Sequence, residues 1–308
     1  NAMNHSTFKS FTFGIGLFFT LPLVYGNSSS PSSSDGTLYI NKSKTHKVAP
    51  VKYGFHYEEI GMMGEGALHA ELIRNRSFEE ATPPAGLSVK NGLYENVPAP
   101  RVKEKKVFQA DPLIGWTTYP LSYTPVFISR TDENPMSGEN KYSMLVNVTE
   151  DIANHPDALI LNRGYYGMNL KTDTSYRLSL FLKNRNYSAP LRVFLVDEWG
   201  QRVSNVIEVN VGNRDWTKYT GELKPEKNVR RGMFAIQPMS KGQFQIDVVS
   251  LFPSDTWNDG KSVFRKDIVQ NLKEFSPSFI RFPGGCIVHG VNEETMYHWK
   301  KTLRSEER

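Results

Sequence analysis

Short runs rich in β-forming residues recur over a long central part of the chain. In Tyr176–Leu182 and Phe244–Ser250, apolar and polar residues alternate with a period of two, which is typical of half-buried β-strands because successive side chains of a strand point to opposite faces. Nine such runs recur between turn signals: Val126–Ser129, Tyr142–Val148, Ala158–Leu161, Tyr176–Leu182, Leu191–Val196, Val203–Val211, Lys218–Leu223, Met233–Gln237 and Gln243–Phe252. This spacing predicts a β-sandwich or jelly roll, which we assign to residues 81–255.

A helical period follows the last of these runs. Apolar residues in Ser262–Phe275 recur near every third or fourth position, which predicts a helix. A loop at Ser276-Pro277 leads into an apolar strand, Ser278–Phe282, that ends at a glycine turn. Helix, loop, strand and turn form one step of an α/β barrel or a doubly wound sheet. Arg281 stands at the end of this strand, either in a functional site or in a structural ion pair.

Two shorter segments near the N-terminal end also predict structure. Thr37–Ile40 and part of Pro50–Ile60 are interpreted as strands, and Ala67–Asn75 as a short helix. In the second strand, His56 and Glu58 are two residues apart and therefore share one face. That face is either a solvent-exposed surface or part of a site.

The first residues are typical of a secreted protein. In residues 1–26, an expression scar precedes Met3, and a basic residue and an apolar run of about 15 residues follow it. This run is shorter than the roughly 20 residues that a membrane helix needs. A signal peptide, with a secreted or periplasmic product and no membrane association after cleavage, is preferred to an uncleaved anchor. Residues 27–36 are a serine-rich linker.

Composition narrows the classes of function. Of 308 residues, 39% are hydrophobic and 22% charged, which is ordinary for a globular protein of up to two domains. The net charge of +5 is scattered and accompanies no nucleic-acid-binding motif, so no nucleic-acid partner is expected. One cysteine, Cys286, excludes an intrachain disulfide and a cysteine-rich metal site. We expect no cofactor and no metal.

Three separated motifs carry a family resemblance. They are Tyr53-Gly-Phe-His-Tyr-Glu-Glu-Ile60, Ala70-Glu-Leu-Ile-Arg-Asn-Arg-Ser-Phe-Glu79 and Arg281-Phe-Pro-Gly-Gly-Cys286. In this order they resemble the N-terminal part of α-L-arabinofuranosidases of glycoside hydrolase family 51, in the branch with a carbohydrate-binding-like β-sandwich inserted in the barrel. The resemblance runs from about Leu38 to the last residue.

The resemblance implies a fold and a set of site residues. The implied fold is mainly β, with a jelly-roll or β-sandwich module plus the first strands and helix of a truncated (β/α)8 barrel, the first barrel strand falling within residues 37–80. Glu58 matches a glutamate that binds arabinose hydroxyls, and Arg281, Cys286 and Trp299 are the other expected substrate-binding residues. Ala67, His69, Glu65 and His289 depart from the family's usual residues, which leaves the sugar specificity open.

The catalytic residues of the family have no counterpart here. Retaining hydrolysis needs two carboxyl groups roughly 5 to 5.5 Å apart, and the family takes both from late barrel strands. The one Asn-Glu dipeptide, Asn292-Glu293, follows the second strand instead. We assign no catalytic residue, and expect residues 256–308 to be the start of an incomplete barrel, since a whole one takes about 250 residues.

Three functions stay open. The first is the N-terminal portion of a secreted retaining α-L-arabinofuranosidase acting on arabinan or arabinoxylan and inactive alone. The second is a non-catalytic carbohydrate-binding protein, and the third a sandwich that only braces a barrel. Candidate stacking platforms for sugar are Trp116, Tyr119, Tyr165, Tyr166, Trp199 and Trp216. Since most sandwich aromatics are core residues, none is assigned.

Overall fold

The computed structural model describes residues 41, 43, 45, 47, 51, 53–58, 61–80, 93–95, 107–109, 111–289 and 296–298. Of 93–95, 107–109, 286 and 287 only the backbone is described. The chain divides into two compact units, Asn1–Ala49 and Pro50–Arg308, and every element named below belongs to the second. The expected signal peptide, the linker, the strand at Thr37–Ile40 and Trp299 lie outside the described residues.

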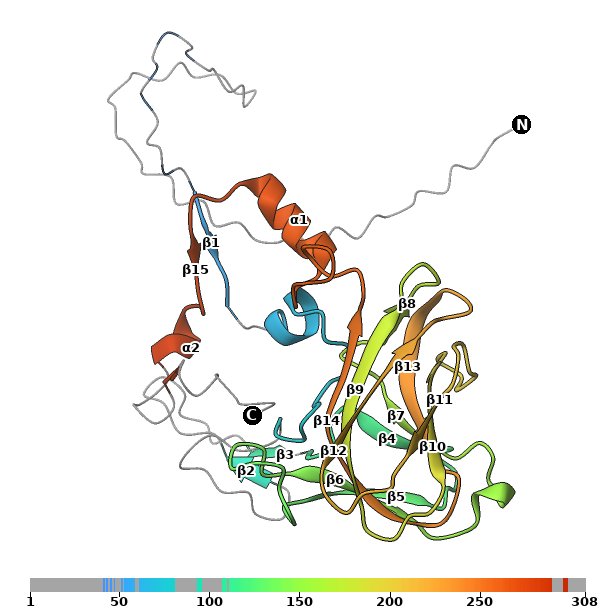
Figure 1. Ribbon diagram of the computed structural model, residues 1–308. Coiled ribbons are helices and arrows are strands. Elements are labelled where there is room, and N and C mark those ends of the chain that lie inside the picture. Colours follow the sequence, from blue (N-terminus) through green and yellow to red (C-terminus); the bar gives the residue numbers. More distant parts are fainter. Residues whose placement is uncertain are drawn as a thin grey trace, which may run out of the picture. The chain divides into compact units, whose positions relative to one another are not determined.

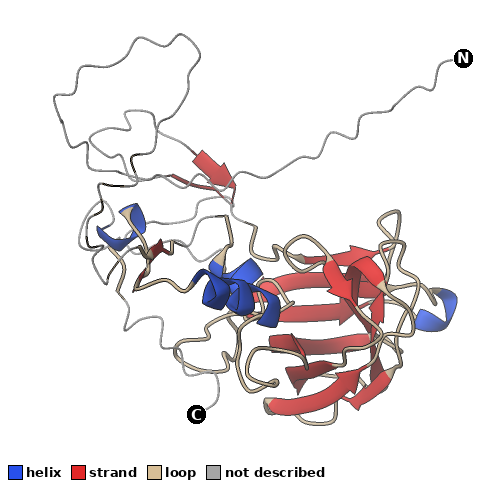
Figure 2. Cartoon of the chain, turned by 90° about the horizontal axis from the view of Figure 1, so that it is seen from above, coloured by secondary structure: helices blue, strands red, loops and turns tan. Residues whose placement is uncertain are grey.

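Two antiparallel sheets form most of the fold (Figures 1 and 2). One has the order β11-β10-β13-β7-β4, with β8 also paired to β13, and the other the order β12-β9-β14-β6-β5. The strands of the first are β4 (Trp116–Tyr119), β7 (Leu159–Asn162), β8 (Met168–Leu170), β10 (Pro190–Val196), β11 (Ile207–Asn210) and β13 (Val229–Gln237). Those of the second are β5 (Val126–Thr131), β6 (Ser143–Val148), β9 (Tyr176–Asn184), β12 (Thr217–Leu223) and β14 (Gly242–Pro253). The mainly β fold and the sandwich are therefore confirmed.

All nine predicted runs contain a strand. The alternation missed β4 and β8, which are four and three residues long and carry too few apolar residues to show a period. A single 3-10 turn, Ile152–Asn154, interrupts the strands between β6 and β7, and the Asp151 carboxylate caps it by accepting from the Ala153 N–H at 3.0 Å.

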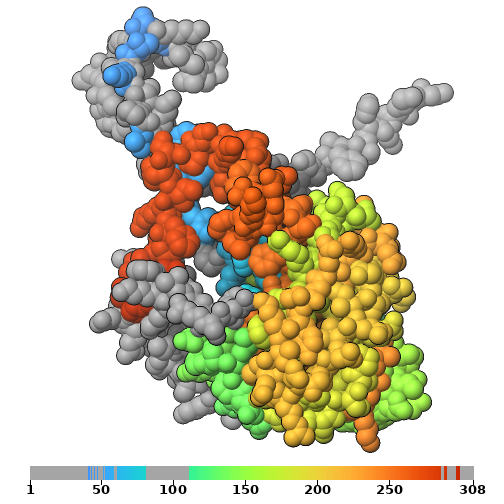
Figure 3. All heavy atoms as spheres, in the orientation of Figure 1, coloured from blue at the N-terminus to red at the C-terminus, as the bar shows by residue number. Residues whose placement is uncertain are grey.

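The core lies between the two sheets and follows from the period of two. In β9, Tyr176, Leu178, Leu180 and Leu182 are buried while the residues between them are more exposed. They meet buried residues of the other sheet, among them Phe234, in one continuous cluster. Each fully buried leucine contributes about 1.5 to 3 kcal/mol. The space-filling view shows the outer surface of this part of the chain, coloured from green through yellow to orange (Figure 3).

The helix predicted at Ala67–Asn75 is wrong. A π-helical turn, η1 (Gly64–Leu68), covers only the first two residues of this range, and the residues that follow form no helix. Their backbone donors serve other segments, since the Ala70 N–H donates to Val263 at 2.8 Å and the Leu72 N–H to Leu251 at 3.1 Å. Tertiary hydrogen bonds thus override the local helical pattern.

Two smaller pairs of strands and two helices complete the structure. β2 (Leu93–Glu95) and β3 (Val107–Gln109) are antiparallel, whereas β1 (Phe55–His56) and β15 (Ile280–Arg281) are parallel. Helix α1 (Lys266–Phe275) precedes β15, and α2 (Cys286–His289) follows it. The described part of the chain contains no helix long and apolar enough to cross a membrane.

Candidate functional site

The two strands that were expected to carry site residues are neighbours. β1 and β15 pair in parallel register, Phe55 with Ile280 and His56 with Arg281. Backbone hydrogen bonds extend the pairing, because the Phe55 N–H donates to Phe279 at 3.0 Å and the Tyr57 N–H to the Arg281 carbonyl at 2.8 Å. Since parallel strands run the same way, the ends that carry Glu58 and Arg281 meet at one edge.

The two faces of this pair differ in chemistry. His56, Glu58 and Arg281 share one face by register and by the period of two. The other face carries aromatic residues, and the rings of Tyr57 and Phe282 lie 5.9 Å apart. The sequence therefore folds into a strand pair with one polar and one apolar side.

The glycine turn after β15 lies directly on Glu58. Gly284 has φ +134°, and a Cβ added there would come within 2.5 Å of Glu58 Cγ. At Gly285 an added Cβ would lie 3.3 Å from His56 Cε1 and 3.5 Å from Glu58 Oε2. Only glycine allows this close approach. We call His56, Glu58, Arg281, Gly284 and Gly285 the strand-end site.

The four predicted site residues have different outcomes. The structure brings Glu58 and Arg281 to the same edge, and it places Cys286 at the first position of α2, immediately after the glycine turn, without describing its side chain. Trp299 is outside the described residues. A carboxylate accepts and a guanidinium donates hydrogen bonds, so residues of these two kinds at one edge can bind sugar hydroxyls. Which ligand they contact stays a prediction.

The motif at residues 69–80, here called the connecting segment, has a structural role. Glu71 is 4% exposed, and its carboxylate accepts from the backbone N–H of Ile73 at 3.0 Å and of Leu251 at 2.8 Å, and from the Ser250 hydroxyl at 2.6 Å. Phe78 is fully buried, with its ring 5.6 Å from that of Trp116. Trp116 is thus a core residue and no sugar platform.

Further contacts fix the same segment to the sandwich. The Glu79 carboxylate accepts from the backbone N–H groups of Lys141 at 2.7 Å and Tyr142 at 3.0 Å. Arg74 donates two hydrogen bonds to Glu80, which raise the pKa of Arg74 above its usual value. The residues of this motif therefore dock the chain on the sandwich and do not belong to the strand-end site.

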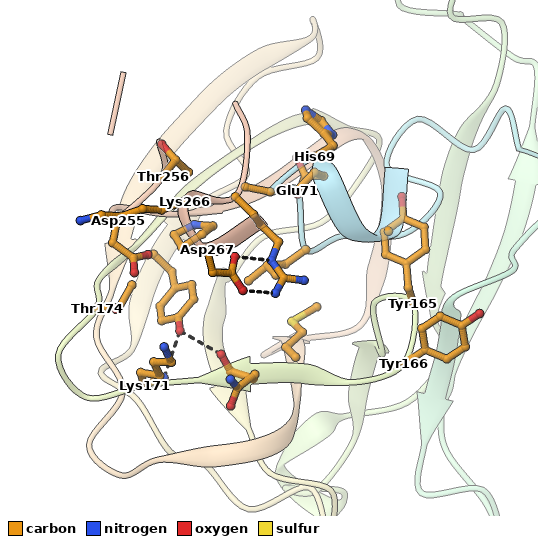
Figure 4. Close-up of a pocket in the computed structure, with 18 of the residues that line it drawn as sticks. His69, Glu71, Tyr165, Tyr166, Lys171, Thr174, Asp255, Thr256, Lys266 and Asp267 are labelled. Carbon is orange, nitrogen blue, oxygen red and sulfur yellow. Dashed lines mark hydrogen bonds and ion pairs between the residues drawn. The ribbon is translucent and has the colours of Figure 1, made fainter. Parts of the chain in front are cut away.

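A cleft of about 720 Å³ lies beside the connecting segment (Figure 4). Besides residues 69–72 of the connecting segment, its wall includes the turn between β7 and β8 with Tyr165 and Tyr166, the residues Asp255 and Thr256 just after β14, and the first turn of α1. Sequence reasoning named the two tyrosines as possible platforms but missed the cleft. The pair of glycines around them, Gly164 and Gly167, was the available signal.

An ion pair forms part of the wall of the cleft. Arg265 donates from Nε to Asp267 Oδ1 at 3.1 Å and from Nη2 to Oδ2 at 2.6 Å (Figure 4). This bidentate contact holds the pKa of the Asp267 carboxyl below its usual value. Burial raises the pKa of the nearby Tyr165 phenol, which stays protonated at neutral pH. Among the described residues, no group of three or more His, Cys, Asp and Glu side chains could hold a metal ion.

Comparison with known proteins finds α-L-arabinofuranosidases among the similar sequences. A family profile described as "Alpha-L-arabinofuranosidase 1 domain" matches residues 271–308, which include β15 and the glycine turn. Alpha-L-arabinofuranosidase 1 of Arabidopsis thaliana is 27% identical over 256 residues, which are 82% of this chain and 34% of the relative. An extracellular exo-alpha-L-arabinofuranosidase of Streptomyces chartreusis is 26% identical, over 82% of this chain and 27% of the relative.

A solved structure agrees with the fold. The arabinose-bound structure of a GH51 α-L-arabinofuranosidase matches 86% of this chain with a TM-score of 0.66 and 24% sequence identity, and the match covers 39% of that protein. The chain thus resembles the N-terminal part of the family 51 α-L-arabinofuranosidases, as its motifs predicted. It spans about a third of the length of the relatives that it matches.

Proposed function

Because the chain resembles the N-terminal part of the family 51 α-L-arabinofuranosidases, we propose that it supplies the arabinose-contacting part of such an enzyme. The observation that carries this proposal is the parallel pairing of β1 with β15, which sets Glu58 against the glycine turn that follows Arg281. In this proposal Glu58 and Arg281 bind hydroxyls of the sugar ring, and Cys286 and Trp299 complete the pocket. The substrates would be arabinan or arabinoxylan, since the relatives act as arabinofuranosidases by name.

The chain alone would not hydrolyse the glycosidic bond. The described part of the strand-end site offers one carboxylate, Glu58, whereas a retaining enzyme needs two that are roughly 5 to 5.5 Å apart. The proposal assigns both catalytic glutamates to later barrel strands. Residues 256–308 would then be the beginning of that barrel, and residues 81–255 the sandwich inserted in it.

Exposed apolar residues support a barrel that continues beyond this strand pair. Phe279, Ile280 and Phe282 are 54%, 56% and 63% exposed, and Phe275 at the end of α1 is 57% exposed. Barrel strands and helices bury such residues against their neighbours. Secretion is also part of the proposal, supported by the apolar N-terminal run and by the extracellular Streptomyces relative.

The first experiment is hydrolysis of 4-nitrophenyl α-L-arabinofuranoside. We expect no release from the 308-residue chain and release from a version extended through the length of the relatives, with kcat/KM reduced at least ~100-fold by Glu58→Gln if Glu58 binds the ring through charged hydrogen bonds. Glu208→Gln, on the exposed side of β11, is the matched control. Release from the short chain would overturn the assignment of the catalytic glutamates, and an inactive extended protein would favour a non-catalytic carbohydrate-binding protein.

A further inference from the structure

We propose that the 720 Å³ cleft beside the connecting segment is a binding site for an uncharged oligosaccharide, separate from the strand-end site. The choice of ligand class rests on the proposed function, because the substrate of an arabinofuranosidase is a polymer of neutral pentoses. The volume is within the range of about 300 to 1,000 Å³ that is usual for small-ligand sites. A site here would hold a few sugar units of the polymer.

The first argument is the fixed turn that carries the two tyrosines. Its glycines have positive φ, +61° at Gly164 and +90° at Gly167, and the Gly167 N–H donates to Arg163 at 3.0 Å. An added Cβ would come within 2.8 Å of Leu72 O at Gly164 and within 3.1 Å of Arg231 Cα at Gly167. The turn is therefore pressed against the connecting segment on one side and β13 on the other, which fixes the backbone that carries the two tyrosines.

The second argument is the unequal burial of those tyrosines. Tyr165 packs on Gly66, where an added Cβ would lie 2.8 Å from its Cγ, and the Arg74 guanidinium lies 5.9 Å from its ring centroid. Tyr166, on the same turn, is 80% exposed. Figure 4 shows it beside Tyr165 at the rim of the cleft, with its ring directed away from Asp267. An aromatic ring that a fixed backbone presents to solvent can stack on the C–H face of a sugar at the rim at a low cost in conformational entropy.

The third argument is the charge of the opposite wall. The positive charge of Arg265 is neutralised by Asp267 within the bidentate pair. Lys171 and Lys266 then stand with Asp255 and the Gln270 amide around the same space. Together these groups both donate and accept hydrogen bonds, and neither positive nor negative charge dominates. The wall therefore suits hydroxyl groups better than a phosphate, a carboxylate or a cation.

Calorimetric titration of the 308-residue chain tests the inference. Arabino-oligosaccharides and xylo-oligosaccharides of three to five units are the probes, and we expect binding that Tyr166→Ala weakens at least ~10-fold, because the variant lacks the ring on which the sugar stacks. Tyr166→Phe keeps the ring and should bind like the original chain. Trp199→Ala, which removes another exposed aromatic residue, 72% exposed on the turn between β10 and β11, should also have no effect.

Three outcomes would overturn the inference: no binding of either probe at millimolar concentration, unchanged binding by Tyr166→Ala, or binding of uronic-acid oligosaccharides alone. The titration needs no catalysis and no residue of the strand-end site. If the extended protein hydrolyses the arabinofuranoside while the titration fails, the cleft inference is wrong and the proposed function stands. If the chain binds the oligosaccharides but the extended protein does not hydrolyse the arabinofuranoside, the proposed function is wrong and the cleft inference stands.

Discussion

At the scale of single residues, the strand-end site depends on a position where only glycine fits. Gly284→Ala adds a methyl group to a residue with φ +134°, 2.5 Å from Glu58 Cγ. We expect the turn and Glu58 to move apart, with a local cost of about 1 to 3 kcal/mol. Hydrogen exchange of residues 54–58 and 279–285 measures the change.

Gly138→Ala is the control for this substitution, because nothing lies within 4 Å of an added Cβ there. It should leave exchange in both segments unchanged. If residues 54–58 and 279–285 exchange at the same rate in the Gly284→Ala protein as in the original chain, the turn does not hold Glu58 in place.

A second residue, Asp247, makes stability depend on pH. It is fully buried next to the irregularity in β14, and one carboxylate oxygen accepts from the Val248 N–H at 2.7 Å while the other has no partner among the described residues. Burial raises the pKa of Asp247 from 3.8 to about 8. The unfolded chain therefore releases this proton near pH 4 and the folded chain only near pH 8, so the free energy of unfolding falls as pH rises between these values.

Asp247→Asn should remove this dependence. The amide keeps the acceptor for Val248 and cannot ionise, so the variant should gain stability over the original chain as pH rises from 4 to 8, by about 1.4 kcal/mol at most for each pKa unit of the shift. Urea denaturation at pH 4, 6 and 8 measures the difference. A constant difference across this range would show that Asp247 is ionised in the folded protein.

At the scale of elements, the connecting segment follows β1 and η1 and is fixed to the sandwich by buried hydrogen bonds. Glu71→Ala leaves the N–H groups of Ile73 and Leu251 without their acceptor. At about 1 to 3 kcal/mol for each buried unsatisfied group, we expect a loss of at least about 2 kcal/mol in the free energy of unfolding. Chemical denaturation of this variant beside Glu208→Ala, which should change stability by less than about 0.5 kcal/mol, measures it.

The same segment shows why a motif can be predictive without its residues being catalytic. Its acidic residues are spaced so that Glu71 reaches β14 and Glu79 reaches the backbone before β6. The sequence pattern alone favoured a helix, because apolar residues at Leu68, Leu72 and Ile73 fit a helical period. The segment is not helical, because its hydrogen bonds go to distant strands. Such contacts cannot be predicted from a local pattern.

At the scale of the whole unit, stability is expected to be uneven. β9 and β14 lie inside a sheet and carry the buried core, whereas β1 and β15 are two residues each and pair only with one another among the described strands. We expect amides of Leu180 and Ile246 to exchange at least ~100-fold more slowly than those of Phe55 and Tyr57. Equal protection in both regions would mean that the strand pair unfolds together with the sandwich.

The sequence by itself determined the sandwich and the resemblance to the arabinofuranosidases. Alternation along a strand and turn residues between strands are local properties, so nine strands could be read from the chain. Glu58 and Arg281 were also named from their motifs, although their contact with a sugar stays a prediction. Short strands such as β4 and β8 escaped because three or four residues are too few to establish a period.

Only the tertiary structure decided which distant segments meet. β1 and β15 are separated by more than 200 residues, and no local pattern fixes their parallel register or the contact of Gly284 with Glu58. The cleft likewise combines a β7–β8 turn, the end of β14 and the start of α1. Its geometry, like the burial of Trp116 and the exposure of Tyr166, follows from how the sheets pack, because the same aromatic residue serves equally well in a core or on a surface.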